Sequence, residues 1–347
     1  MRTITRPSTS RCTMPLYISF LLSEPNYPSS CRLAKLMNIS HDSVNRFILR
    51  ERFTAKDLFD QAKPQLILKG GVLSVDDSVL DKPYSHHMAL VGHFWSGKHH
   101  RSVKGINLIT LYYTDPSGHH LPVNYRIYDH AEEKTKNDYF LDMLDEVMEW
   151  GLMPSCATGD SWYSATKNLK AIRNKGLSFM VALKSNRQVS LENNVFMPIK
   201  SVDIPPEGVV VWLREFGFVR LYRTTLKNEH RHYALYLADE TQLNHVDRTK
   251  FESIHDQHWQ IEQYHRAIKQ VCHIEHSQVR GESGVRNHVF AALSGYIHLQ
   301  TMCLAELITN TYALQRNLFN EVISGFIGRT ASMIKGLIPK FKPSYNA

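Results

Sequence analysis

The sequence has few cysteines and no long apolar run, and both absences narrow the class of protein. Its five cysteines are an odd, widely spaced set without a Cys-x-x-Cys pair. Neither a disulfide framework nor a zinc site is indicated, so we expect a reduced, cytoplasmic protein. Cys272, His273 and His276 lie close in sequence, but so few soft ligands are weak evidence for a metal. No apolar stretch reaches the ~20 residues that a membrane span needs, and we find neither internal repeats nor low-complexity segments.

The balance of charge favours a polyanionic partner. Lys and Arg number 41 against 33 Asp and Glu, a net charge of +8 in 347 residues, which is a hint of nucleic acid rather than proof of it. The chain is long enough for two or three domains.

The N-terminal segment superficially resembles a signal peptide, because three arginines precede the apolar run 14–22. The run is short, has Pro15 near its start and lacks a small-residue cleavage site. We therefore predict a short core helix with Pro15 in its first turn. Residues 1–13 are predicted to be a disordered extension, with Met14 as a candidate start.

Residues 31–50 have the spacing of a helix-turn-helix unit. Asn38 suits the left-handed conformation of a tight turn, and Ser40 suits the N-cap of a second helix. We expect Leu33, Ala34, Leu36 and Met37 to form one apolar stripe, with Val44, Phe47 and Ile48 facing it. Asn45 and Arg46 then face outward as candidate DNA contacts, although any helical hairpin shares this pattern.

The remaining chain alternates between strand and helix signals. Strands are predicted at 72–80, 103–113, 121–128, 153–158 and 179–183, with helices at 139–150 and 164–175. Residues 98–101 are expected to be a strongly basic loop. Three further strands at 209–212, 218–224 and 232–237 suggest an all-β insertion, and residues 285–330 are helical and apolar.

These signals predict six segments along the chain. They are a disordered extension (1–13), a helical DNA-binding region (14–69), the first part of an α/β core (70–184), a β-rich insertion (185–250), the second, helical part of the core (251–330) and a basic tail (331–347).

The stretch 255–270 has no Gly or Pro and is predicted to be one helix. Steps of three or four residues from Glu262 reach His258, Trp259, His265 and Arg266. A single carboxylate among basic and aromatic groups makes sense if it holds a metal while the cations touch phosphates. The alternative is an amphipathic helix packed through Trp259, Ile261 and Ile268.

Acidic residues follow two predicted strands, at Asp76 and Asp160. A strand, an antiparallel hairpin, a helix and another strand place these two acids on neighbouring strands, where a packed helix can bring Glu262 beside them. Three clustered carboxylates repel one another unless cations bind them, and hard oxygen ligands select Mg²⁺ or Mn²⁺, here two ions. Taken singly, Asp160 could be a helix N-cap and Asp76 could simply end a strand.

These motifs resemble those of bacterial insertion-sequence transposases of the DDE type, in the group with a β-rich insertion before the Glu. The similarity lies in the segments Val75–Leu80, Gly159–Tyr163 and Trp259–Lys269. Glu262 and Lys269 fit the Tyr–Arg–Glu–Lys signature of that group, whereas His255 and His258 stand at its Tyr and Arg positions. Asp76 is preferred over Asp77 because it directly follows Val75, as in the family.

The resemblance implies an RNase H-like α/β fold with flanking helices, and a catalytic and metal-binding triad of Asp76, Asp160 and Glu262. It also implies double-stranded DNA as partner, in element ends and target, and a homodimer in the synaptic complex of a bacterial cytoplasm. We expect His258 to bind phosphate when protonated, and Lys104, Arg266 and Lys269 to contact phosphates. Two rivals stay open: a purely hydrolytic nuclease, and an inactive remnant that only binds DNA.

Overall fold

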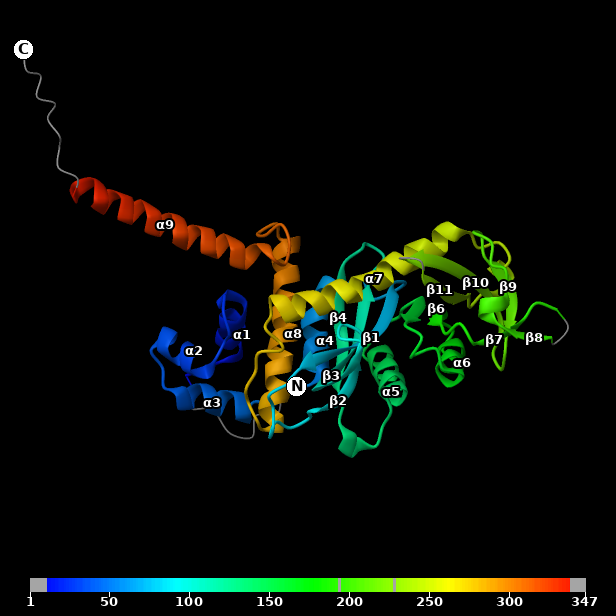
Figure 1. Cartoon of the computed structure of the whole chain (residues 1–347), viewed down its shortest axis with the longest axis horizontal. Coiled ribbons are helices and arrows are strands. Elements are labelled where there is room, and N and C mark those ends of the chain that lie inside the picture. The colour runs from blue at the N-terminus through cyan, green and yellow to red at the C-terminus, as the bar shows by residue number, and fades with distance from the viewer. Residues whose placement is uncertain (1–10, 193–194, 227–228, 338–347) are drawn as a thin grey trace, which may run out of the picture.

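The structure is a computed structural model that describes residues 11–192, 195–226 and 229–337. It contains a large mixed sheet flanked by helices (Figure 1), which confirms the predicted α/β fold class. The helices are α1 (Met14–Ser23), α2 (Ser30–Met37), α3 (His41–Arg50), α4 (Ala55–Ala62), α5 (Lys136–Glu149), α6 (Thr166–Asn174), α7 (Arg248–Gln270), α8 (Glu282–Leu304) and α9 (Ala313–Leu337). The strands are β1 (Val72–Asp81), β2 (Gly92–Ser96), β3 (Arg101–Thr114), β4 (His120–Ile127), β5 (Cys156–Gly159), β6 (Ser178–Leu183), β7 (Gln188–Ser190), β8 (Phe196–Pro198), β9 (Val209–Leu213), β10 (Gly217–Leu226) and β11 (Glu229–Tyr236).

Strand β1 lies inside the sheet, with β3 on one side and β5 on the other. Strand β3 pairs antiparallel with β1 and with β4, whereas β5 is parallel to β1, and β6 is parallel to β5. The predicted path of strand, antiparallel hairpin, helix and parallel strand is therefore confirmed. Strand β2 was not predicted; it pairs with the start of β3, and the expected basic loop is the turn that joins the two.

The β-rich segment continues the same sheet. Strand β11 pairs antiparallel with β6, and the order runs on through β10, β9, β7 and β8. The prediction of extra strands here was right, but they extend the core sheet rather than closing on themselves.

The two faces of the sheet bury different helices. On β1, Leu73 and Val75 pack with residues of α5 and α6 such as Tyr139 and Leu169. Leu80 belongs to the core of the opposite face, which includes residues of α7 and α8. Helix α7 crosses the sheet, and α8 stands between the sheet and the helices α1, α2 and α3 (Figure 1). Because alternate residues of a strand point to opposite faces of the sheet, odd-numbered and even-numbered residues of β1 contact different helices.

The N-terminal hairpin forms as its turn residues predict. Asn38 adopts φ 49° and ψ 47° after α2, and Ser40 caps α3 by accepting a hydrogen bond from the Ser43 amide. Val44, Phe47 and Ile48 are buried, and α3 packs on α8. The predicted stripe was wrong in part, because Leu36 and Met37 are 51% and 48% exposed.

The first described residues also correct a prediction. Cys12 is buried, and the amides of Arg11 and Cys12 donate to Ser43 Oγ, so residues 11–13 are not a disordered extension. Residues 1–10 lie outside the described part. Helix α1 begins as predicted, with Pro15 in its first turn.

The C-terminal region is helical as predicted, with a break at 305–312 between α8 and α9. Of the expected basic tail, 331–337 belong to α9 and 338–347 lie outside the described residues. Within the described part of the chain, no helix has the length and apolar character that crossing a membrane requires.

Candidate active site

Asp76 and Asp160 follow paired positions of two neighbouring parallel strands. Val75 of β1 is in register with Gly159 of β5, and each is followed by an aspartate. A Cβ atom on Gly159 would lie 2.9 Å from Val75 Cγ1, so a side chain here would crowd the Val75 side chain. The register therefore places the two aspartates at equivalent positions of neighbouring strands.

The third acid, Glu262, comes from α7, which packs on β1 and β5. Glu262 is exposed on α7, yet partial desolvation raises its pKa, and the Asp76 carboxylate raises it further. Partial desolvation and then Asp76 raise the pKa of Asp160 to about 7, although the amides of Trp162 and Tyr163 oppose this shift and the residue is exposed at the end of β5. Asp76 therefore influences both other acids, and the three form one electrostatic cluster.

Asp76 is the member of the cluster that is held ionised. The backbone amide of Asp77 donates to Asp76 Oδ1 at 2.8 Å, and Nδ1 of His265 lies 3.4 Å from Oδ2. Burial would raise the pKa of Asp76, but His265 and the other neighbouring groups lower it below its usual value. His265 itself is 6% exposed, and within the described residues its Nε2 has no hydrogen-bond partner.

Asp77 points to the opposite face, where its oxygens are already occupied. Its Oδ2 accepts hydrogen bonds from Asn107 Nδ2 at 2.6 Å and Lys136 Nζ at 2.7 Å. Its Oδ1 accepts one from Tyr163 Oη at 3.2 Å. This arrangement favours Asp76, rather than Asp77, as the member of the acidic cluster.

His258 is fixed to the sheet rather than free to clamp a phosphate. Its Nδ1 lies 2.9 Å from Thr158 Oγ1, and Thr158 donates onward to Ser74 Oγ at 2.8 Å. Burial lowers the pKa of His258 to about 4, with Asp76 opposing that shift. Burial therefore disfavours the protonated form that the expected phosphate contact requires, and one ring nitrogen is already engaged.

The predicted cations differ in how free they are. Lys269 donates to the Val79 carbonyl at 2.7 Å and lies 3.3 Å from Glu275 Oε1. Arg266 is exposed on α7, near enough to Glu262 to stabilise its carboxylate. Lys104 is half-buried on β3. Lys269 thus begins with two protein partners, whereas Arg266 faces solvent.

The candidate DNA contacts of the N-terminal region lie on the outer face of α3. Arg46 is exposed, and Asn45 is half-buried with its Nδ2 3.1 Å from His41 Nδ1. They come from another part of the molecule than the acidic cluster (Figure 1). The outer face of α3 and the acidic cluster are therefore two separate sites on the molecule.

The donor set fits a hard divalent cation in its chemistry. Repulsion from the Asp76 carboxylate raises the pKa values of Asp160 and Glu262. A bound cation would relieve this repulsion. As they stand, no three His, Cys, Asp or Glu side chains of the described chain lie close enough together to hold an ion. Asp76, Asp160 and Glu262 are the residues that would have to converge.

Sequence reasoning missed the groups that support the cluster. His265 lay on the predicted stripe of α7 but received no role, although its spacing of three from Glu262 was a usable signal. Thr158 and Ser74 are polar residues inside buried strands, which is a second signal. Lys136, which pairs with Asp77, and Glu275, which pairs with Lys269, come from distant segments, and nothing in their local sequence marks them.

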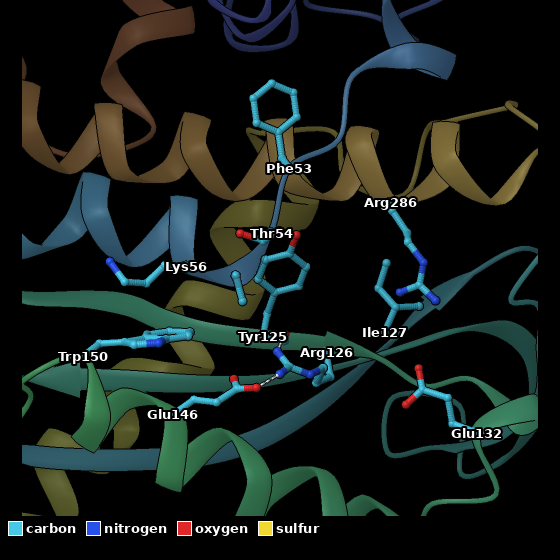
Figure 2. A pocket seen from close by; sticks show the side chains of 11 residues that line it. Phe53, Thr54, Lys56, Tyr125, Arg126, Ile127, Glu132, Glu146, Trp150 and Arg286 are labelled. Atoms are coloured by element: carbon cyan, nitrogen blue, oxygen red, sulfur yellow. Dashed lines mark hydrogen bonds and ion pairs between the residues drawn. The ribbon is translucent and has the colours of Figure 1, made fainter. Parts of the chain in front are cut away.

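A separate cavity of about 460 Å³ lies between the start of α4, β4, α5 and α8 (Figure 2). It contains none of the predicted site residues. Its charged groups are largely paired, because Arg126 contacts Glu146 across it and Arg286 contacts Asp129 and Glu282. This hollow is therefore a poorer candidate for chemistry than the acidic cluster.

Comparison with known proteins identifies the family. Residues 68–297 match a family model described as the transposase DDE domain, and the chain belongs to this family. The matched range contains Asp76, Asp160 and Glu262. Among curated proteins, no match was found.

One of the similar solved structures is the Drosophila P element transposase strand transfer complex, with 12% identity and a TM-score of 0.28. The match covers 51% of this chain and 38% of that chain, so this chain spans well under half of its length.

Proposed function

We propose that this chain is the transposase of a bacterial insertion sequence, a cytoplasmic, nucleoid-associated protein that acts as a homodimer in its synaptic complex. In this proposal it binds the ends of the element and catalyses DNA strand cleavage and strand transfer. The observation that carries the proposal is the acidic cluster of Asp76, Asp160 and Glu262 within a chain of the transposase DDE family.

The proposed division of labour follows the segments of the chain. Residues 14–69 serve as the DNA-binding region, with Asn45 and Arg46 on its outward helix. Residues 70–184 and 251–330 form the catalytic core, and 185–250 extend its sheet. The net charge of +8 supports a polyanionic substrate.

In this proposal, Asp76, Asp160 and Glu262 would hold two divalent ions, either Mg²⁺ or Mn²⁺. When bound, such ions activate a water or a 3′-hydroxyl and stabilise the leaving oxygen of a phosphodiester. The chain's own contribution is positioning. His265 keeps Asp76 ionised, the Trp162 amide orients Asp160 at 2.8 Å, and the contact between His258 and Thr158 ties α7 to β5 beside Glu262.

The proposed phosphate-binding side chains differ in whether they already contact another group of the protein. Arg266 supplies a free cation next to Glu262, and Lys104 a second one from β3. Lys269 must exchange its contact with Glu275 for a phosphate. We assign His258 a positioning role in place of the phosphate clamp, because burial holds its pKa near 4.

The test is DNA cleavage by the full chain on a plasmid that carries the sequences flanking its reading frame. With Mg²⁺ we expect nicks at the element ends and joined products, and with EDTA neither. Asp160→Ala should remove both products while end binding persists. Hydrolysis without joining would favour the simple nuclease, and end binding without any cleavage would favour the inactive remnant.

A further inference from the structure

The stretch that follows the strand of Asp76 contains no carboxylate. No Asp or Glu occurs between Asp81 and Asp115, a range that includes the whole of β2 and β3. The same stretch contains five histidines and four cations, which are Lys82, Lys98, Arg101 and Lys104. Protein surfaces usually mix both signs of charge, so a stretch of one sign indicates a polyanionic partner.

Strand β3 connects this stretch to the acidic cluster. Asp76 of β1 pairs with Thr110 of β3, so the even-numbered side chains of β3, Lys104 among them, share the sheet face of Asp76. On β2, which is the edge strand beside β3 (Figure 1), His93 pairs with Lys104. Alternation then places Trp95, two residues further on, on that face as well.

The outer end of the β2–β3 hairpin leaves this face uncovered. Ile106 of β3 is buried in the core that includes residues of α7 and α8. Two residues before it, Lys104 is only half-buried, and on β2 His93 is exposed. Trp95 is 68% exposed, which is unusual for so large an apolar ring and indicates a surface that a partner covers.

The cations of the hairpin differ in where they point. Lys98 and His99 contact Asp81 at the end of β1, at 3.6 Å and 2.9 Å. Arg101 is exposed, but it stands three positions before Lys104 and so belongs to the opposite face. Lys104 forms no ion pair with any carboxylate of the described chain. It is therefore the hairpin cation available on the face of the acidic cluster.

We propose that His93, Trp95 and Lys104, here called the hairpin surface, bind double-stranded DNA that leads to the acidic cluster. Lys104 binds a phosphate, and the indole of Trp95 packs against the sugars beside it, because a large ring with one N–H donor gains most from burial at an interface. The inference rests on the proposed function and adds to it the place at which the catalytic core holds its DNA.

The strand register also gives the position of this contact along the DNA. Lys104 is separated from Thr110, the partner of Asp76, by six residues of β3, or about 20 Å. Trp95 pairs with Ser102, about 26 Å from the same point. Duplex DNA rises ~3.4 Å per base pair. The hairpin surface should therefore contact DNA about six to eight base pairs from the bond that is cut.

An acidic protein is the other partner that this charge fits. DNA is favoured because the hairpin surface lies on the same sheet face as Asp76, so one duplex can reach both. Sugar and phosphate contacts carry no sequence information directly. The hairpin surface should therefore bind element ends and unrelated duplexes alike, unlike the outer face of α3.

The experiment measures DNA binding by the full chain in EDTA, on end DNA and on an unrelated duplex, over a range of salt concentrations. Trp95→Ala should weaken binding about 10-fold or more on both DNAs, and Trp95→Phe should recover most of that loss because a ring is retained. Lys104→Ala should flatten the log–log salt dependence by about one unit. Arg101→Ala, the matched control on the opposite face, should flatten it by less than about half as much.

Hydroxyl-radical footprints on end DNA locate the contact. Trp95→Ala should lose protection about six to eight base pairs from the cleaved bond and keep it elsewhere. Wild-type binding and footprints in both Trp95→Ala and Lys104→Ala, or an equal loss in Arg101→Ala, would overturn the inference. A wild type that shows this footprint but never cleaves would instead contradict the proposed function and leave the hairpin surface in place.

Discussion

Nδ1 of His265 on α7 lies 3.4 Å from Oδ2 of Asp76 on β1. The contact joins the helix that carries Glu262 to the strand that carries Asp76. It also biases the charge of the cluster, because His265 helps to hold the pKa of Asp76 low while Asp76 helps to raise the pKa of Asp160 and Glu262. One buried imidazole thus contributes to the unequal protonation of three neighbouring acids.

His265→Leu should lower cleavage without removing the fold. The substitution deletes the group that orients Asp76, and loss of such a supporting partner typically costs about 10–100-fold in activity or metal affinity. The measurement is the cleavage rate as a function of Mg²⁺ concentration, with Gln260→Leu, half-buried on the same helix, as control. A positioning role predicts a larger Mg²⁺ requirement in His265→Leu, whereas an unchanged requirement with a lower melting temperature would reduce His265 to a packing residue.

Asp160 should make the metal-free protein less stable at alkaline pH. Its folded pKa is raised to about 7, whereas an unfolded aspartate titrates near ~3.9. The folded state therefore retains a proton that the unfolded chain releases, and this contribution to stability is lost as the pH rises from about 4 to 7.

Thermal unfolding in EDTA tests that sign. Asp160→Asn should match the wild type most closely at about pH 4 and exceed it at about pH 8. Added Mg²⁺ should then raise the melting temperature of the wild type at alkaline pH more than that of the variant. A constant offset between the two proteins at both pH values would show that Asp160 is not strained by its neighbours.

The sequence predicted the local features well because their causes are local. The Asn38 turn, the Ser40 cap and the opposite faces of Asp76 and Asp77 each follow from a few adjacent residues. It failed where the cause was distant. Leu36 and Met37 fit an apolar stripe, but the sequence of α2 alone does not show which part of the chain packs against it. Lys136 contacts Asp77, which lies 59 positions away in the sequence. The burial that lowers the pKa of His258 likewise depends on β5, which carries Thr158.

Arg266 and Lys269 should differ in their salt dependence. Arg266→Ala should flatten the log–log salt dependence of DNA binding by about one unit, because one phosphate contact is lost. Lys269→Ala should flatten it less, since the Glu275 carboxylate already partners this amine, and should also lower stability. Binding isotherms over a range of salt concentrations give both slopes. A sequence-selective loss in either variant would mean that the side chain reads a base.

The outer face of α3 should carry recognition of the element ends. Replacing both Asn45 and Arg46 by Ala should cost about 1–3 kcal/mol of discrimination per lost base contact, while metal-dependent hydrolysis of non-specific DNA continues. Footprints on end DNA measure the effect, with the half-buried Lys56→Ala on α4 as control. An unchanged footprint in the double variant would remove α3 from the interface.

The central claim is that Asp76, Asp160 and Glu262 bind the divalent ions and Asp77 does not. Titration of the full chain with Mn²⁺, followed by electron paramagnetic resonance, tests it directly. We expect binding in the wild type, loss of at least one ion in each of Asp76→Asn, Asp160→Asn and Glu262→Gln, and retained binding in Asp77→Asn. The last variant should instead lose about 1–3 kcal/mol of stability, since Lys136 would lose its partner. Normal Mn²⁺ binding by Asp76→Asn together with its loss in Asp77→Asn would contradict the account.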